Sequence, residues 1–238
     1  MNNWKRVKWY ELRAWLVHFY TSLGLMTGFL ALIAIVDLNA KSAFFWMGIA
    51  LVIDATDGTL ARKFNIKQWT PRFDGRKLDD ITDYLNYAFL PVFFMWRFEL
   101  VTGAGLFILF LVLIAAIYGF CQSGAKTDDG YFTGFPNFWN VLVLYLFTFN
   151  WSEVTNLFIL LTFTILVFVP FKFVSFSTPG KVMLAKGLAL VYFLMLVMVV
   201  IFDNRLIALA SLMFPTLYFG YAIFLRFKPK LVLATSNL

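Results

Sequence analysis

Long runs of apolar residues, separated by short polar segments, dominate the chain. A helix needs about 20 apolar residues to cross the hydrocarbon core of a bilayer. Eight runs approach or exceed that length, namely 16–37, 43–62, 78–97, 104–122, 137–150, 155–174, 184–202 and 205–226. They are continuous rather than alternating, which argues against transmembrane strands. The pattern therefore predicts an all-α, polytopic integral membrane helix bundle with about eight transmembrane helices.

The composition agrees with this interpretation and excludes ordinary soluble proteins. Of the 238 residues, 61% are hydrophobic and 14% are charged, whereas a typical soluble domain is about 25% charged. The apolar runs leave no room for a soluble domain, so we expect a single membrane domain over residues 1–238. Basic and aromatic residues mix over 2–14, which is typical of an interfacial helix. Residues 226–238 are predicted to form a cytoplasmic tail.

Basic residues are concentrated in every second connection between the apolar runs. If the runs alternate in direction, 17 of the 20 Lys and Arg residues fall on one side of the membrane. The other side keeps Lys41, Arg97 and Arg205. Cytoplasmic loops carry an excess of Lys and Arg. The asymmetry therefore predicts an even number of spans with both termini in the cytoplasm.

Acidic residues break the apolar pattern in one place, because six of the 13 lie between residues 54 and 83. At about 100° per residue, two helical faces emerge. The face on the second run holds Asp54, Asp57, Gly58 and Ala61. The face on the third run holds Asp79, Asp83, Asn86 and Tyr87. The two runs are antiparallel, so we expect the four carboxylates of these faces to converge near the cytoplasmic side.

Four carboxylates in a poorly hydrated place need positive counter-charge. Two divalent cations would supply it, and an all-oxygen ligand set suits Mg²⁺ or Mn²⁺. Metal pairs about 4 Å apart are a known device of phosphoryl chemistry. The alternative is that the acids are interface charges paired with Arg62, Arg76 and Lys77. That alternative is favoured for Asp74 and Asp80 alone.

The acidic motif resembles the signature of the CDP-alcohol phosphatidyltransferase family, D-x2-D-G-x2-A-R, a spacer, and G-x3-D-x3-D. The matching positions are Asp54, Asp57, Gly58, Ala61, Arg62, Gly75, Asp79 and Asp83. The spacer 63–74 has 12 residues, which is longer than the family's general pattern. This spacer, the number of spans and the segment 126–140 resemble a bacterial branch of the family that uses choline as the acceptor.

The resemblance implies a metal-dependent transfer of the phosphatidyl group of CDP-diacylglycerol to choline, which gives phosphatidylcholine and CMP. It implies two Mn²⁺ or Mg²⁺ ions per site, a homodimer, and a bacterial inner membrane with the site facing the cytoplasm. Asp54, Asp57, Asp79 and Asp83 would be metal ligands, and Asp83 would also be the general base. The residues implied to contact CDP-diacylglycerol are Asp54, Gly58, Ala61, Arg62 and Gly75.

Choline is a quaternary ammonium ion, which aromatic faces recognise. Position along the chain narrows the many aromatic residues to a short set of candidate choline contacts, together with one amide. They are Tyr84, Asn86, Tyr87, Tyr131 and Trp139. Two further expectations concern the first run, where His18 should form an interhelical hydrogen bond and the Gly24/Gly28 pair should allow close helix packing.

Two alternative functions remain open from the sequence. The acceptor could be serine, inositol phosphate or glycerol phosphate, although beyond Arg62 no Lys or Arg within the apolar runs lies near the aspartates, which favours a cationic or neutral acceptor. The chain could also be a cation transporter, since carboxylates in membranes often mark ion routes. The acids gather at one end of the spans, so a path through the membrane is poorly supported.

Overall fold

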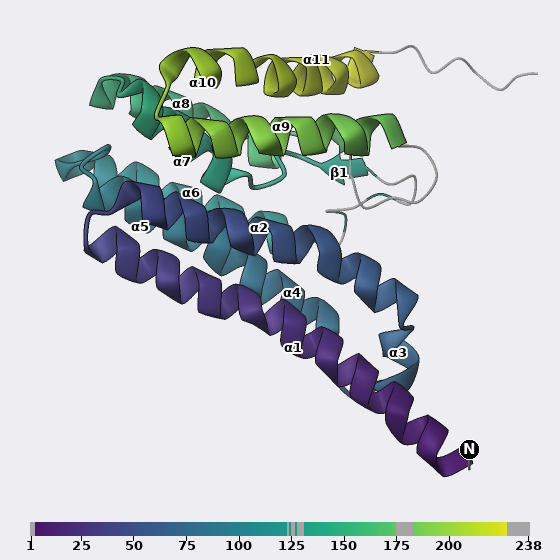
Figure 1. The fold of residues 1–238 in the computed structure, drawn as a ribbon. Coiled ribbons are helices and arrows are strands. Elements are labelled where there is room, and N and C mark those ends of the chain that lie inside the picture. Colours follow the sequence, from purple (N-terminus) through teal and green to yellow (C-terminus); the bar gives the residue numbers. More distant parts are fainter. Residues whose placement is uncertain (1–2, 123, 125–126, 128–130, 175–182, 228–238) are drawn as a thin grey trace, which may run out of the picture.

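The chain folds into a bundle of long helices that run back and forth along one direction (Figure 1). The computed structural model describes residues 3–122, 124, 127, 131–174 and 183–227. The first half contains α1 (Asn3–Val36), α2 (Ala40–Lys63), the short α3 (Ile66–Trp69), α4 (Gly75–Tyr84), the π-turn η1 (Leu85–Phe89), α5 (Leu90–Arg97), the 3₁₀ turn η2 (Gly103–Gly105) and α6 (Leu106–Cys121). The second half contains α7 (Trp139–Phe149), α8 (Glu153–Phe168), α9 (Met183–Phe202), α10 (Arg205–Ser211) and α11 (Met213–Phe227).

The helices match the eight predicted apolar runs, because α4, η1 and α5 follow one another without a break and α10 leads directly into α11. Four helical stretches are long and apolar enough to cross a membrane, namely Arg6–Val36, Ala40–Lys63, Gly103–Cys121 and Arg205–Arg226. The helices over Trp139–Phe149, Glu153–Phe168 and Gly187–Phe202 are apolar but shorter. The chain is therefore an all-helical integral membrane protein in its main architecture, and the exact number of spans stays a prediction.

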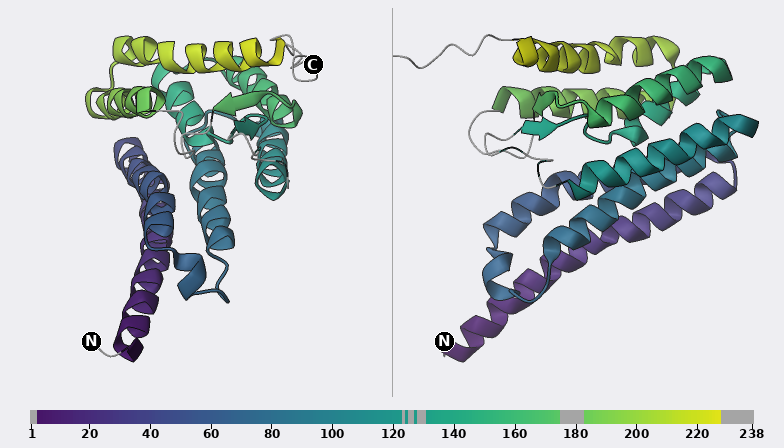
Figure 2. Two further views of the ribbon diagram at one scale, coloured as in Figure 1. Left: turned by 90° about the vertical axis from the view of Figure 1, so that its right-hand side faces the viewer. Right: turned by 180° about the vertical axis from the view of Figure 1, so that it is seen from behind.

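The connections differ strongly between the two ends of the bundle. The tight turns after α1, α5, α7 and α9 lie at one end, on the left of Figure 1. The longer connections lie at the other end, where α1 begins and α11 ends, and Figure 2 shows the same arrangement from two further sides. This end carries α3 and the acidic motif. The described part of the chain therefore begins and ends at the same end of the bundle.

The first helix differs from the prediction of a separate interfacial helix over 2–14. The structure has one continuous helix, α1, from Asn3 to Val36. Residues 3–23 contain neither Gly nor Pro, so nothing in the sequence interrupts the helix between its basic start and its apolar part. At 1.5 Å per residue, 34 residues rise about 50 Å, which exceeds the bilayer core. The start of α1 accordingly extends beyond the other helices in Figure 1.

A small β-sheet is the second feature that the sequence did not predict, although the fold as a whole is helical. Strands β1 (Tyr131–Thr133) and β2 (Lys172–Val174) pair antiparallel, with Tyr131 opposite Val174. They belong to two connections that meet at the same end of the bundle, so backbone groups outside the helices pair with each other. Such pairing between distant segments leaves no periodic signal in either one. Most of the predicted tail 226–238 lies outside the described residues.

The three basic residues at the end with tight turns each bind the carbonyl end of a neighbouring helix. Arg97 donates from Nη2 to the carbonyl oxygen of Val36 at 2.9 Å, where α1 ends. Lys41 donates to Ile201 near the end of α9 at 3.0 Å, and Arg205 donates to Thr148 near the end of α7 at 3.3 Å. Helix ends have unpaired carbonyls and a partial negative charge. The exceptions to the charge asymmetry therefore serve as caps between helices.

Removing one of these caps should weaken the bundle measurably. We expect Arg97→Met to lower the free energy of unfolding by about 1 kcal/mol, because the Val36 carbonyl loses a charged donor. Thermal unfolding of the detergent-solubilised protein measures the effect. Arg97→Lys is the control, since it keeps a cation near the same carbonyl and should lose less. An unfolding midpoint of Arg97→Met equal to that of the wild type would contradict the capping role.

Candidate active site

Helix α2 brings two carboxylates to one face in the half that leads into α3. Asp54 and Asp57 are three residues apart, so they lie on the same side of the helix. The side chain of Asp57 is 5% exposed, whereas Asp54 is half-buried. The hydroxyl of Tyr87 donates to Oδ2 of Asp54 at 2.8 Å. Because Tyr87 belongs to the third run, this hydrogen bond connects the second run to the third.

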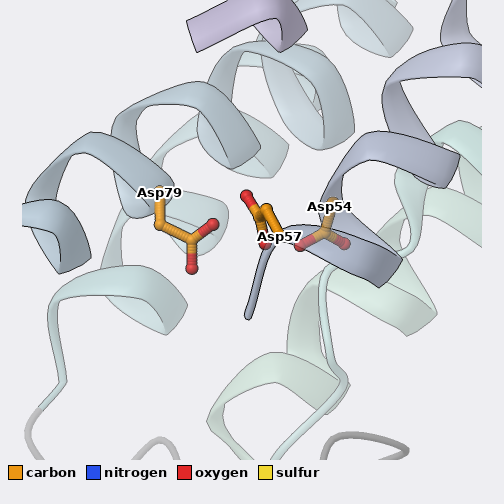
Figure 3. Close-up of side chains that lie close together, drawn as sticks. All are labelled: Asp54, Asp57 and Asp79. Atoms are coloured by element: carbon orange, nitrogen blue, oxygen red, sulfur yellow. The ribbon is translucent and has the colours of Figure 1, made fainter. Parts of the chain in front are cut away.

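Helix α4 supplies the other two carboxylates of the motif. It begins at Gly75, and the side chain of Asp74 caps it by accepting from the backbone N–H of Lys77 at 3.1 Å. Carboxylate oxygens of Asp54, Asp57 and Asp79 lie within 4.8 Å of one another. Figure 3 shows these three side chains pointing toward a common space, with Asp57 between the other two. The predicted convergence of α2 and α4 carboxylates is thus confirmed for three residues.

The fourth carboxylate, Asp83, lines the same cavity without belonging to the group of three. The cavity lies between α1, α2 and the helix formed by α4 and η1. Its lining consists of Thr21, Gly24, Ala50, Ile53, Asp54, Asp57, Asp79, Thr82, Asp83, Asn86 and Tyr87. The cavity therefore contains all four positions of the third-run face, whereas the second-run face contributes Asp54 and Asp57 but not Gly58 or Ala61.

A π-turn follows Asp83 directly. Residues Leu85–Phe89 form η1, and its Asn86, Tyr87 and Ala88 are buried. A π-turn widens the helix locally and often accompanies functional sites. Here it directs Tyr87 to Asp54 and Asn86 to α1, where Asn86 Nδ2 donates to the carbonyl oxygen of Gly24 at 3.0 Å. The sequence analysis placed both residues on the correct face but did not predict the turn.

The donor set of the cavity fits a hard divalent cation. Among the residues that the structure describes, the lining contains four carboxylates and no Lys, Arg or His. Like charges this close repel strongly in surroundings poor in water. Carboxylate oxygens are the ligands that Mg²⁺ and Mn²⁺ prefer. A metal ion bound by Asp54, Asp57 and Asp79 would turn the mutual repulsion into attraction.

The neighbouring acids Asp74 and Asp80 behave as ordinary interface charges. Asp80 lies 3.9 Å from Arg76, and Asp74 lies 3.8 Å from Lys77, all four being exposed at their side chains by 40% or more. Among the described residues, these are the two ion pairs of the motif region. The alternative of paired surface charges is therefore right for Asp74 and Asp80 and does not apply to the cavity.

The remaining motif residues on α2 surround an exposed guanidinium. Arg62 donates from Nη2 to the hydroxyl of Thr59 at 3.3 Å. A Cβ atom built on Gly58 would lie 3.4 Å from Nη1 of Arg62. The guanidinium thus lies beside Gly58, and the small side chain of Ala61 leaves space on the adjoining surface. A phosphate group at this surface would meet both backbone and positive charge.

Gly75 has a packing reason that the motif alone did not reveal. A Cβ atom there would lie 2.8 Å from Cε1 of His18, so the ring of His18 occupies the space that a side chain would fill. His18 also shares a hydrogen bond between its Nε2 and Oγ1 of Thr70 at 2.8 Å, but Thr70 lies in the connection after α3, so the partner is not on another helix as predicted. Gly75 thus packs against His18 of α1. The contact of Gly75 with CDP-diacylglycerol stays a prediction.

The long spacer forms a cap against α1, which sequence reasoning missed. Trp69 in α3 stacks on Tyr10 with ring centroids 4.7 Å apart. Phe73 contacts His18 at 4.5 Å and Trp15 at 5.1 Å. The additional spacer residues therefore fold back onto the start of α1 just before Gly75 begins α4. The aromatic residues at 10, 15, 69 and 73 were the available signal for this contact.

The candidate choline contacts separate into two groups. Asn86 and Tyr87 line the cavity, and Tyr84, on the adjoining turn, is half-buried with its ring 6.1 Å from that of Phe120. Tyr131 lies in β1, where the ammonium of Lys172 sits 5.5 Å from its ring centroid.

Trp139 lies in the hydrophobic core and does not line the cavity, and its contact with choline stays a prediction. Its side chain is 0% exposed, and its Nε1 donates to Oδ1 of Asn137 at 3.2 Å. It packs against Phe135 within the hydrophobic core. An apolar run cannot reveal from sequence which of its aromatic rings face inward.

Comparison with known proteins identifies the family. No protein-family model matches the chain. A phosphatidylcholine synthase of Borreliella burgdorferi is 36% identical over 225 residues, which are 91% of this chain and 96% of that protein. Phosphatidylcholine synthases of Pseudomonas aeruginosa and Legionella bozemanae are 37% identical over 164 residues and 46% identical over 149 residues. These alignments cover 68% and 62% of this chain and 69% of each relative. The chain belongs to the bacterial phosphatidylcholine synthase family.

Proposed function

We propose that the chain makes phosphatidylcholine and CMP from CDP-diacylglycerol and choline. The observation that carries this function is the convergence of Asp54, Asp57 and Asp79 from two helices, in a chain that matches a phosphatidylcholine synthase over nearly its whole length. The carboxylates lie at the end of the bundle where the charged motif meets the membrane surface. A lipid substrate and a water-soluble acceptor can both reach such a position.

The metal ligands are Asp54, Asp57 and Asp79, with Asp83 as the fourth carboxylate of the site. Their support is the shared cavity and the absence of a basic residue from its lining. Mn²⁺ or Mg²⁺, two ions per site, would supply positive charge that neutralises the diphosphate and the leaving CMP. Gly58, Ala61 and Arg62 form the adjoining surface for the CDP group, with Gly75 at its far side.

Asp83 is the general base of the proposed reaction. Its carboxylate accepts the proton of the choline hydroxyl, and the choline oxygen forms a bond to the phosphorus that carries diacylglycerol. The bond between that phosphorus and the oxygen of CMP breaks, so CMP leaves with the electron pair. Asp83 suits this role because it lines the cavity beside the group of three rather than within it.

Choline suits the charge of the cavity better than the alternative acceptors do. The lining offers carboxylates to a quaternary ammonium and no cation to a phosphate or carboxylate of the acceptor. Tyr84, Asn86 and Tyr87 are the candidate contacts that adjoin Asp83, and aromatic faces bind such cations. Tyr131 remains a candidate at the neighbouring surface.

The proposed location is a bacterial inner membrane, with eight spans and with the active site and both chain ends toward the cytoplasm. The support is the 17 to 3 distribution of basic residues and the grouping of long connections at the end of the bundle that carries the motif. A homodimer remains an expectation from the family resemblance.

Metal binding should stabilise the folded protein in a way that depends on the cavity carboxylates. A ligand that binds only the folded state at one hundred times its dissociation constant adds about 2.7 kcal/mol. We expect Mn²⁺ to give such a gain to the wild type and Asp57→Asn to lose most of it. The measurement is thermal unfolding with Mn²⁺ and with a chelator. Asp80→Asn, whose carboxylate pairs with Arg76, is the control, and equal gains for wild type and Asp57→Asn would refute the metal site.

The reaction itself is tested with purified protein, CDP-diacylglycerol, Mn²⁺ and labelled choline, beside labelled serine and inositol phosphate. We expect labelled phosphatidylcholine from the wild type. Asp83→Asn should lose a factor of 10²–10⁴ in turnover, because an amide cannot take the hydroxyl proton, and should still bind CDP-diacylglycerol. Asp80→Asn should remain active. Product with serine alone would overturn the acceptor, and near-normal turnover of Asp83→Asn would overturn the base.

A further inference from the structure

Helix α1 is the common support of the two helices that carry the cavity carboxylates. It packs along α2 and also against α4, η1 and α5. Among the described elements, α2 and α4 make very few contacts with each other. The positions of Asp54 and Asp57 relative to Asp79 and Asp83 therefore depend on how each helix lies against α1.

The approach of α4 and η1 to α1 is unusually close at two glycines. A Cβ atom on Gly24 would lie 2.6 Å from Cγ2 of Thr82, and one on Gly28 would lie 2.8 Å from Oδ1 of Asn86. Real Cβ contacts essentially never fall below 3.0 Å. Gly24 and Gly28 are one helical turn apart, as are Thr82 and Asn86. The predicted close packing at the glycine pair is confirmed, and its partners are now known.

One hydrogen bond of Asn86 crosses this contact to α1, and a second one, within its own helix, orients the amide. Nδ2 of Asn86 donates to the carbonyl oxygen of Gly24 at 3.0 Å and to that of Thr82 at 2.9 Å. Asn86 is 3% exposed. Its Oδ1 faces Gly28 and has no hydrogen-bond partner among the described residues. A buried amide oxygen without a hydrogen bond lowers the stability of the fold. We therefore expect Asn86 to serve a purpose beside the site that outweighs this cost.

We propose that Thr82 and Asn86 are positioning residues that set the placement of Asp79 and Asp83 against Asp54 and Asp57 through the α1 glycines. Each lies three residues after one of the α4 carboxylates, and both line the cavity. Catalytic groups must be held within about 0.5 Å of the productive geometry. Moving α4 away from α1 displaces Asp79 and Asp83, whereas Asp54 and Asp57 stay on α2. The inference rests on the proposed metal site for its Mn²⁺ readout and on the proposed reaction for its activity readout.

A rescue experiment tests this contact atom by atom. Gly24→Ala introduces the clash with Cγ2 of Thr82, and Thr82→Ser removes that methyl group and keeps the hydroxyl. Without Cγ2, the nearest neighbour of the new Cβ is Nδ2 of Asn86 at 3.8 Å, an ordinary contact. Gly48→Ala is the matched control, since a Cβ there meets nothing within 4 Å.

The readouts are Mn²⁺ affinity, from the electron paramagnetic resonance signal of free Mn²⁺, together with kcat and the KM for choline. We expect Gly24→Ala to weaken Mn²⁺ binding at least tenfold and to lower kcat at least as much, with little change in KM. Gly48→Ala should stay within about threefold of the wild type, and Thr82→Ser in the Gly24→Ala background should restore most of the lost Mn²⁺ affinity and kcat. Unchanged Mn²⁺ affinity in Gly24→Ala, or a double variant as poor as the single one, would overturn the proposal.

Asn86→Ala provides a second test that adds no bulk and does not depend on the folding of Gly24→Ala. Its matched control is Asn156→Ala. Asn156 is also buried, donates to the carbonyl oxygen of Leu100 at 3.0 Å and has an unpaired Oδ1. Asn86→Ala should weaken Mn²⁺ binding at least tenfold, whereas Asn156→Ala should lower the unfolding temperature without changing Mn²⁺ affinity. Equal Mn²⁺ affinities of the two variants would overturn the positioning role. Mn²⁺ binding that follows these expectations in a protein without turnover would refute the proposed function and leave this inference standing.

Discussion

Mutual repulsion among carboxylates is the constraint on which the arrangement of this bundle depends. Oxygens of Asp54, Asp57 and Asp79 lie within 4.8 Å of one another, and no basic side chain lines their cavity. Left alone, α2 and α4 would be driven apart. Their few direct contacts do not oppose this, so α1 holds both of them. A bound cation would then work together with α1 rather than replace it.

The membrane explains why that support takes the form of glycines and a buried amide. Lipid tails are as apolar as the helices, so burying apolar surface gives little reason for two helices to associate. Close van der Waals contact and interhelical hydrogen bonds remain. Gly24 and Gly28 permit the contact, and Asn86 supplies the hydrogen bond. The precision of the site is thus obtained from small residues on a helix that contributes no carboxylate to it.

Periodicity and motif spacing predicted the helices, the acidic faces and the close packing at the α1 glycines, because each is a local repeat along one helix. The π-turn at Leu85–Phe89, the cap formed by α3 and the pairing of β1 with β2 were not predictable in this way. Each depends on a contact with a distant segment. Trp139 illustrates the same limit, since only the packing of Phe135 and Asn137 around it shows that it belongs to the core.

Other charged side chains near the ends of the helices differ from the cavity carboxylates in the partners that they bind. Arg97, Lys41 and Arg205 bind carbonyls at helix ends. Glu153 accepts the backbone N–H of Thr102 at 2.6 Å. These charges all find protein partners that lower the cost of placing them near a bilayer. Asp57 is instead almost fully buried among other carboxylates. Charges inside a membrane are expensive and are kept where they have a function, and this supports the proposal that the cavity carboxylates bind a metal ion.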